Sequence, residues 1–275
     1  MTAFKAACVQ LNSGNDMAVN LQAAETAIRE AAARGAQLIT LPEYAALLDG
    51  SGRVMRENSP VEEGHPALAK FRALARETGA WLLVGSLTVK LDGEHMANRS
   101  YLLSADGAIA AQYDKIHMFD VTLPSGKAIR ESSAYRPGDK AVVAATPWGP
   151  LGMSICYDLR FPQLYRALAR AGALFLAVPS SFQRETGVAH WHALLRARAI
   201  ENLAYVFAPA MCGDHPNNRM TYGHSLIIDP WGKVLAELGA GPGIAIADID
   251  VDQVLKVRGM LPSLEHDRAF SGPAA

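Results

Sequence analysis

The sequence lacks several features that are typical of common protein classes. Only three of its 275 residues are cysteine, namely Cys8, Cys156 and Cys212, which are too few and too far apart for a disulfide framework. Free thiols in this number are typical of a reducing compartment, so we expect a cytoplasmic protein. The N-terminus has no basic segment before a long apolar run, so the sequence predicts no signal peptide.

The sequence also has no large excess of charge of one sign and no long uncharged stretch. Lys and Arg number 26 and Asp and Glu number 27, a formal net charge of −1 with no long run of either sign. Proteins that bind nucleic acid usually concentrate basic charge, so we expect no nucleic-acid partner. The longest window without charge, residues 141–157, contains prolines and glycines that would interrupt a membrane helix, so we expect no membrane span.

Binding motifs for phosphate and metal are missing as well. No Gly-x-Gly-x-x-Gly segment follows a predicted strand. The candidate metal ligands in the second half are Cys212, Asp214, His215, His224, His190 and His192. Their spacing matches no zinc signature, and helical residues two apart face in different directions. We therefore expect no metal and no cofactor.

The sequence does contain an alternation of apolar runs and helical patterns. Residues 4–11, 37–41 and 81–84 are predicted strands, and residues 16–34 and 65–78 are predicted helices that end at or just before a glycine. This order of elements predicts an α/β protein with an at least partly parallel sheet.

Two segments of the first half recur in the second half. Residues 34–43 resemble residues 171–180, and residues 100–107 resemble residues 225–232, each of the latter pair being a predicted hairpin. Helix-ending glycines and hairpin turns are common, and they alone can produce such a likeness. The other interpretation is two similar half-domains whose bare sheet faces pack into an α-β-β-α sandwich. No linker-like stretch separates the halves, so we expect a single domain over residues 1–275.

Residues 117–139 break this alternation. They contain two prolines and two glycines with polar residues between them and no clear period. A loop of this length in a compact domain is usually functional or disordered, and its neighbours in the sequence favour function.

Cys156 is a candidate nucleophile because of its position. Residues 152–158 predict a short strand that runs into a sharp turn, before a helix that begins near Pro162. A nucleophile at such a turn is exposed at the sheet edge, and the following N–H groups can face an oxyanion. The alternative is a buried structural cysteine, the commoner case, which is what we expect for Cys8 in the middle of a strand. No histidine lies in an obvious position to activate the thiol.

A glutamate and a lysine are better placed for that purpose. Glu43 follows the predicted strand 37–41, at the strand end where α/β sheets build their sites, and is either a solvated loop carboxylate or a base in apolar surroundings. Lys115 ends the predicted strand 109–115 on its apolar face, where a lysine needs a counter-charge or a function. Glu43, Lys115 and Cys156 could therefore converge at strand ends.

At these residues the chain resembles the nitrilase superfamily of carbon–nitrogen hydrolases. The matching segments are Leu41-Pro42-Glu43, residues 113–120, Arg130-Glu131-Ser132, residues 154–162 and Tyr222-Gly223-His224-Ser225. The likeness covers nearly the whole chain, with the motifs in the family's order. It implies a four-layer α-β-β-α sandwich and an enzyme that needs neither cofactor nor metal.

The resemblance also implies a role for each matching residue. Cys156 corresponds to the nucleophile, Glu43 to the general base and Lys115 to the residue that stabilises the transition state. Glu131 matches a second glutamate that positions the substrate and helps to orient the lysine. The ammonium is expected to favour the thiolate and, with the backbone N–H of Tyr157, to hold the oxyanion. The amide is then cleaved through a thioester.

The substrate is expected to be a small-molecule amide. Residues 135–139, 190–202 and 212–213 are most similar to the branch of the family that cleaves deaminated glutathione to α-ketoglutarate and Cys-Gly. The alternatives are an ω-amidase acting on α-ketoglutaramate, then a nitrilase, then a catalytically silent binding protein. His192 departs from the acidic residue found in many relatives.

Further residues are candidates for substrate binding and for assembly. Both amidase substrates are anionic, so Arg160 is either a partner for a carboxylate or part of a structural salt bridge, for example with Asp158. The candidate aromatic residues, which line the pocket or fill the core, are Tyr44, Phe119, Tyr157 and Phe182. The family resemblance implies a homodimer or a higher homo-oligomer. The expected interface comprises the helix after Cys156, the helix around 189–202 and the C-terminal tail, about 250–275.

Overall fold

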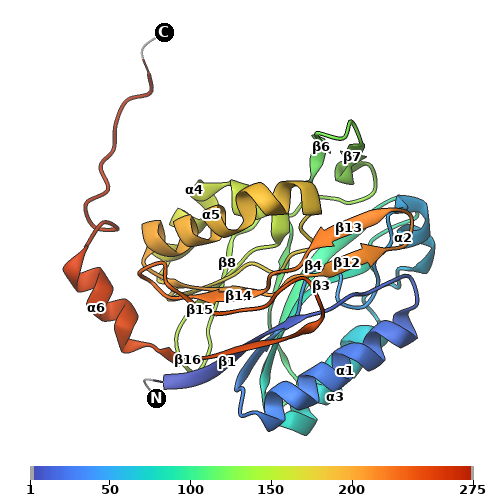
Figure 1. Ribbon diagram of the computed structural model, residues 1–275, viewed down its shortest axis with the longest axis horizontal. Helices are drawn as coiled ribbons and strands as arrows, with labels where there is room; N and C mark the ends of the chain where they lie inside the picture. The colour runs from blue at the N-terminus through green and yellow to red at the C-terminus, as the bar shows by residue number, and fades with distance from the viewer. Residues whose placement is uncertain (1–2, 274–275) are drawn as a thin grey trace.

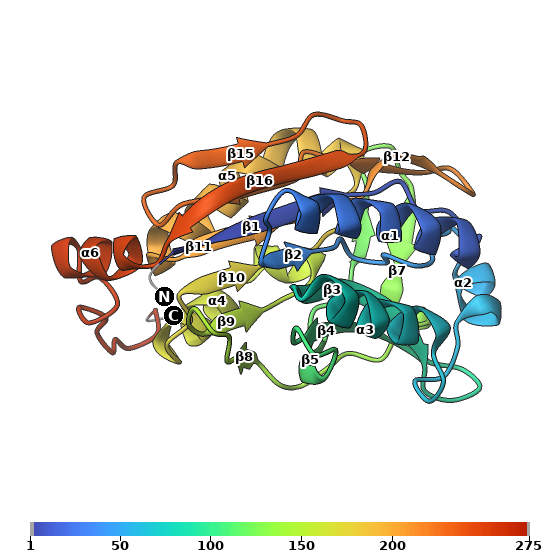
Figure 2. The same cartoon turned by 90° about the horizontal axis from the view of Figure 1, so that it is seen from below.

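The computed structural model describes residues 3–273 as two six-stranded sheets that pack face to face, with helices on their outer faces (Figures 1 and 2). The expected α-β-β-α sandwich is confirmed. The first sheet has the order β16-β1-β2-β3-β4-β5. Its strands are β1 (Ala3–Gln10), β2 (Leu38–Thr40), β3 (Trp81–Lys90), β4 (Met96–Leu103), β5 (Ile109–Asp114) and β16 (Gly243–Asp250).

The second sheet has the order β15-β14-β11-β10-β9-β8. Its strands are β8 (Val142–Ala144), β9 (Leu151–Met153), β10 (Phe175–Ala177), β11 (Tyr205–Ala208), β14 (Leu226–Ile228) and β15 (Val234–Glu237). The helices are α1 (Met17–Ala33), α2 (Gly52–Asn58), α3 (Pro66–Thr78), α4 (Pro162–Arg170), α5 (Arg184–Asn202) and α6 (Asp252–Met260).

The two sheets are built on the same plan. In the first, β1, β2 and β3 are parallel and are connected through α1 and α3; in the second, β9, β10 and β11 are parallel and are connected through α4 and α5. An antiparallel strand flanks each parallel set on both sides. The recurring segments of the sequence occupy equivalent places, since β2 corresponds to β10 and the β4–β5 hairpin to the β14–β15 hairpin. This likeness therefore reflects two similar halves.

The core follows from the alternation of side chains along each strand. In β1, Ala6 and Cys8 face the second sheet, while Ala7 and Val9 face the layer of α1 and α3. Phe4 lies between the sheets, where its ring stacks on Trp148 with centroids 4.4 Å apart and meets Phe175 edge-on at 5.4 Å. The second sheet is covered on its other side by α4 and α5.

The ends of the predicted helices agree with the structure because local signals define them. The Asp16 side chain caps α1 by accepting hydrogen bonds from the N–H groups of Ala18 and Val19, and Gly79 ends α3 with φ at 66°. The strand prediction at 109–115 was only partly right. Its apolar face is not uniformly buried, because β5 is an edge strand: Ile109 is 40% exposed, and burial begins at Tyr113.

Residues 117–139, for which the sequence predicted a loop without regular elements, contain short ones. They form a small hairpin of β6 (Asp120–Thr122) and β7 (Ala128–Arg130), followed by the 3-10 turn η1 (Glu131–Ser133). A second small hairpin comprises β12 (Cys212–His215) and β13 (Arg219–Tyr222). Within residues 3–273, no helix is long and apolar enough to cross a membrane.

Candidate active site

A cavity of about 240 Å³ opens where the two halves meet, and it contains the residues expected to react. Glu43, Lys115, Glu131 and Cys156 all line it, so the structure brings the four predicted catalytic residues together. Glu43 follows β2 and Lys115 follows β5 in the first half, Glu131 begins η1, and Cys156 follows β9 in the second half.

A bulge in β3 holds the segment that carries Glu43. The β3–β4 register shifts between Val84 and Leu87, which leaves Gly85 and Ser86 free to meet the chain after β2. The Ser86 hydroxyl accepts the N–H of Tyr44 at 2.9 Å, and the Ser86 carbonyl accepts the N–H of Ala45 at 3.1 Å. Only glycine fits at position 85, because a Cβ there would lie 2.0 Å from the carbonyl oxygen of Leu41.

The carboxylates of Glu43 and Glu131 both contact the ammonium of Lys115. Lys115 Nζ donates to Glu43 Oε1 at 3.1 Å and to both oxygens of Glu131 at 2.8 Å. Glu43 Oε2 accepts the N–H of Ser181 at 2.8 Å, and Glu131 Oε2 accepts the N–H of Phe119 at 2.6 Å. Lys115 is 2% exposed, so this buried charge has the counter-charges that it requires.

Cys156 lies on a strained turn at the start of the 3-10 helix η2 (Cys156–Arg160). Its φ is +49°, in the region that favours glycine, and its N–H donates to the carbonyl of Pro179 at 2.9 Å. The side chain of Asp158 stabilises this turn. It is fully buried and accepts hydrogen bonds from the Tyr113 hydroxyl at 2.7 Å and from the N–H of Ile155 at 2.9 Å.

The charges in the cavity shift the pKa values of the reacting groups. Burial raises the pKa of the Cys156 thiol, Glu43 raises it further, and Lys115 only partly opposes them. Burial alone would raise the pKa of Glu43, but Lys115 and Arg219 hold it below its usual value. Lys115 therefore favours the thiolate, as expected, but burial and the Glu43 charge outweigh the ammonium. The site instead pairs a neutral thiol with an ionised carboxylate.

Asn98, on β4, was missed by the sequence analysis. Its side chain is 1% exposed and donates to Glu43 Oε1 at 2.8 Å and to Glu131 Oε1 at 3.4 Å. It therefore links the two carboxylates that contact Lys115. A polar residue in the middle of a buried strand was the available signal, because such a side chain needs a buried partner.

Of the two interpretations offered for Arg160, the structure excludes only the salt bridge with Asp158. Arg160 is not among the residues that line the cavity. It also forms no salt bridge with Asp158, which is taken up by Tyr113, His117 and the backbone. The Arg160 guanidinium instead lies 5.4 Å from the centre of the Phe182 ring, with its Nη atoms 3.3 Å from His190 Nδ1. Arg160 thus packs against Tyr157 and Phe182, two rings that line the cavity.

The predicted aromatic residues do line the cavity. Tyr44, Phe119, Tyr157 and Phe182 all contribute to its wall. Phe119 and Tyr157 pack edge to face with centroids 5.0 Å apart, and the Tyr44 hydroxyl donates to Glu131 Oε1 at 3.1 Å. The cavity is thus apolar on one side and charged at its base.

Arg219, on β13, is the basic residue that the sequence analysis did not select. It lines the cavity, lies 5.6 Å above the Tyr44 ring and donates from Nη2 to the Ser181 hydroxyl at 2.9 Å. Its buried Nε and the buried Tyr135 hydroxyl have no hydrogen-bond partner among residues 3–273. Buried donors without a partner are rare, and these two belong to residues that line the cavity. Lys127 and Arg130 add positive charge from the β6–β7 hairpin.

This fold, with a thiol, a carboxylate and an ammonium in one enclosed cavity, is characteristic of hydrolases that act on carbon–nitrogen bonds. A model of the carbon–nitrogen hydrolase family matches residues 5–258, and the chain belongs to that family. The protein is accordingly an enzyme that acts on amide carbon–nitrogen bonds.

Individual relatives cover nearly the whole chain. A protein from Synechocystis sp. named deaminated glutathione amidase is 41% identical over 271 residues, which is 97% of this chain and 98% of the relative. The crystal structure of C. elegans NitFhit matches 98% of this chain with a TM-score of 0.91 and 36% identity; the chain spans 66% of that longer protein.

A third similar protein is an amidase from Nesterenkonia. Its structure is 27% identical, with a TM-score of 0.80, and the match covers 94% of this chain and 98% of that one. It is described as showing the Michael addition of acrylamide at the active-site cysteine.

Proposed function

We propose that the protein is a thiol-dependent amidase that hydrolyses deaminated glutathione to α-ketoglutarate and Cys-Gly. The observation that carries this proposal is the cavity, in which Cys156 lies beside Glu43 and Lys115 while Arg219 presents an unpartnered N–H. The similarity to proteins named deaminated glutathione amidase supports the choice of substrate. The reactive cysteine of the Nesterenkonia amidase supports Cys156 as the nucleophile.

The first half of the proposed reaction forms a thioester. Because the pKa of the Cys156 thiol is raised, the thiol keeps its proton until attack, and the ionised Glu43 takes that proton. The sulfur bonds to the amide carbon, and the carbonyl electron pair moves to oxygen. Lys115 Nζ and the N–H of Tyr157 stabilise this oxyanion; the first N–H groups of a helix have no partner within it, which leaves the Tyr157 N–H available.

The second half releases both products. As the oxyanion collapses, the carbon–nitrogen bond breaks and Glu43 returns its proton to the amine of Cys-Gly. Glu43 then takes a proton from water, whose oxygen attacks the thioester carbon. The bond to sulfur breaks, α-ketoglutarate leaves, and Glu43 returns its proton to the sulfur, which restores the Cys156 thiol. In this scheme Glu131 and Asn98 are positioning residues, because they contact Lys115 and Glu43 rather than the reacting carbon.

Arg219 is proposed to bind the α-keto acid carboxylate of the substrate. Its guanidinium reaches the cavity from β13 and lowers the pKa of Glu43, which indicates that it lies close to the reacting groups. Lys127 and Arg130, on the β6–β7 hairpin, also line the cavity, and we assign them to the terminal carboxylate of Cys-Gly. A guanidinium donates charge-assisted hydrogen bonds to a carboxylate.

One assay tests the substrate. α-Ketoglutarate release is measured in parallel from deaminated glutathione and from α-ketoglutaramate, with C156A as the control. A higher kcat/KM for deaminated glutathione supports the proposal. Preference for α-ketoglutaramate assigns the protein to the ω-amidases instead. No release from either substrate by a folded protein refutes both assignments.

We also propose that the protein is a cytoplasmic homodimer. The three cysteines are buried and free, as suits a reducing compartment. Large apolar side chains are exposed on α6 and the segment after it, and these are Leu255, Met260, Leu261 and Phe270. That segment runs away from the domain in Figure 1, and its last residues, 274–275, lie outside the described range. Deletion of residues 262–275 should therefore weaken the dimer in light scattering coupled to gel filtration.

A further inference from the structure

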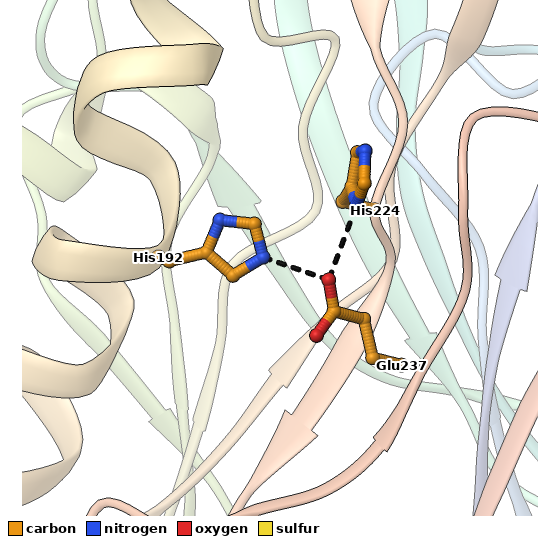
Figure 3. Close-up of side chains that lie close together, drawn as sticks. All are labelled: His192, His224 and Glu237. Carbon is orange, nitrogen blue, oxygen red and sulfur yellow. Dashed lines mark hydrogen bonds and ion pairs between the residues drawn. The ribbon is translucent and has the colours of Figure 1, made fainter.

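Three side chains from separate segments meet on the outer side of the second sheet, away from the cavity. His192 lies on α5, His224 follows β13 and Glu237 ends β15. Figure 3 shows both imidazole rings directed at one carboxylate oxygen. His192 Nε2 lies 2.8 Å and His224 Nδ1 lies 3.1 Å from Glu237 Oε1. One ligand atom from each residue lies within 4.8 Å of the other two.

The backbone holds two of these residues in place. His224 has φ at +56°; its N–H donates to the carbonyl of Gly239 at 3.2 Å, and its carbonyl accepts the indole N–H of Trp191 at 2.8 Å. Its ring stacks on Tyr222 with centroids 4.3 Å apart. Glu237 pairs with Leu226 in the β14–β15 ladder. These contacts hold His224 and Glu237 in position, so the cluster is preorganised.

The donor set suits a particular class of ion. Two imidazole nitrogens and one carboxylate oxygen are ligands that zinc and other first-row transition metals accept, whereas calcium and magnesium prefer oxygen alone. With metal–nitrogen bonds of about 2.0–2.1 Å, two ligands of a tetrahedral ion lie about 3.3 Å apart. Small side-chain movements bring the three atoms to that spacing. Each side chain is between 26% and 35% exposed, so water completes the coordination.

We propose that His192, His224 and Glu237 form a binding site for a divalent transition-metal ion. Each imidazole binds the ion through the nitrogen that now faces Glu237, and the proton on that nitrogen passes to the other ring nitrogen or to solvent. The ion thereby links α5 to the β14–β15 hairpin. The residue just before α5, Gln183, and Thr186 in its first turn line the catalytic cavity, so the ion stiffens that wall without entering the reaction. This proposal replaces the expectation of no metal, which rested on sequence spacing. The three ligands are too far apart in the sequence to form a recognisable motif.

Calorimetric titration of the chelator-treated full chain with ZnCl₂ tests the site. The expected result is one ion per chain, with affinity reduced at least tenfold in both H192Q and E237Q. H190Q is the matched control, because His190 is an exposed histidine on the same helix that contacts Arg160 instead. C156A excludes binding by the cavity thiol. Both controls should bind zinc like the unaltered protein.

A second measurement keeps the test decisive if one variant folds poorly. ZnCl₂ should raise the unfolding temperature of the unaltered protein and of H190Q, but not that of E237Q. Circular dichroism and amidase turnover show which variants are folded. The proposal would be overturned if the unaltered protein bound no zinc, or if H192Q and E237Q bound zinc as tightly as the unaltered protein does. The cluster would then be only a hydrogen-bonded link between α5 and β15.

Discussion

Replacement of Glu43 by Gln is the sharpest test of the proposed chemistry. The substitution keeps the shape of the side chain but removes its charge and its ability to accept a proton. Lys115 keeps both contacts with Glu131, so the buried ammonium retains a counter-ion. The amide oxygen of Gln can replace Oε1 and accept from Asn98 and Lys115, and only the hydrogen bond from the N–H of Ser181 to Oε2 is then lost. We therefore expect a folded variant whose defect lies in proton transfer.

The size of the effect follows from the state of the thiol. Since the pKa of Cys156 is raised, almost no thiolate exists near pH 7 without a base. General acid–base catalysis contributes about 10²- to 10⁴-fold, so kcat/KM of E43Q should fall by that factor, or about 2.7–5.4 kcal/mol in activation free energy. The charge of Glu43 is also one cause of the raised thiol pKa. Its removal should therefore leave the alkylation of Cys156 by iodoacetamide at pH 8 as fast as before, or faster.

The two measurements together separate a lost base from a damaged site. α-Ketoglutarate release gives the turnover, and mass spectrometry gives the rate of alkylation. E30Q, which removes an exposed glutamate on α1, is the control and should change neither rate. Turnover of E43Q within tenfold of the unaltered enzyme would refute the assignment of Glu43 as the base. Alkylation that falls in parallel with turnover would refute the reasoning about the thiol.

Three further predictions address binding, pH and folding. R219Q should raise KM for α-ketoglutaramate by about 10- to 100-fold, because a hydrogen bond to a charged group contributes about 1.5–3 kcal/mol. R160Q is the control and should change this KM little. Equal effects of the two substitutions would contradict the role of Arg219. Because the pKa of Glu43 is lowered, its active, ionised form is lost only as the pH falls through that pKa. The acid limb of kcat/KM should therefore have its midpoint below the ordinary glutamate value of about 4.3. A midpoint above that value would be inconsistent with the proposal. G85A should lower the free energy of unfolding by about 1–3 kcal/mol in urea titrations and reduce turnover, because its Cβ collides with the chain that carries Glu43. In G93A the new Cβ would have no atom within 4 Å, so this control should be nearly neutral. Similar losses in both variants would count against the packing argument.

The parts of the fold that were predictable are those with strong local signals. Asp16 and Gly79 mark helix ends, and the apolar runs at β1 and β2 are continuous because both faces of those strands are buried. The helix α2 and the hairpin β6–β7 were missed. Both are short and mostly exposed, so their sequences carry little hydrophobic periodicity.

The reactive residues were predictable for a similar reason. Glu43, Lys115 and Cys156 each follow a strand, and the family motifs extend over their neighbours. The contact of Arg160 with His190 was not predictable, because sequence spacing does not specify which residue of α5 lies beside η2. Arg219 was missed because it reaches the cavity from a hairpin far along the chain, and only tertiary packing brings it beside Tyr44.

The pairing of β16 with β1 has a consequence for how the protein is made. Residues 243–250 complete the sheet that begins with residues 3–10, so the first sheet stays unfinished until most of the chain has left the ribosome. Until then β1 is an edge strand with an unpaired row of N–H and C=O groups, the kind of surface on which nascent chains aggregate. A chain truncated before residue 243 contains every residue of the catalytic cavity but not the strand that covers this edge. Such a fragment should depend on chaperones even though its reactive groups are all present.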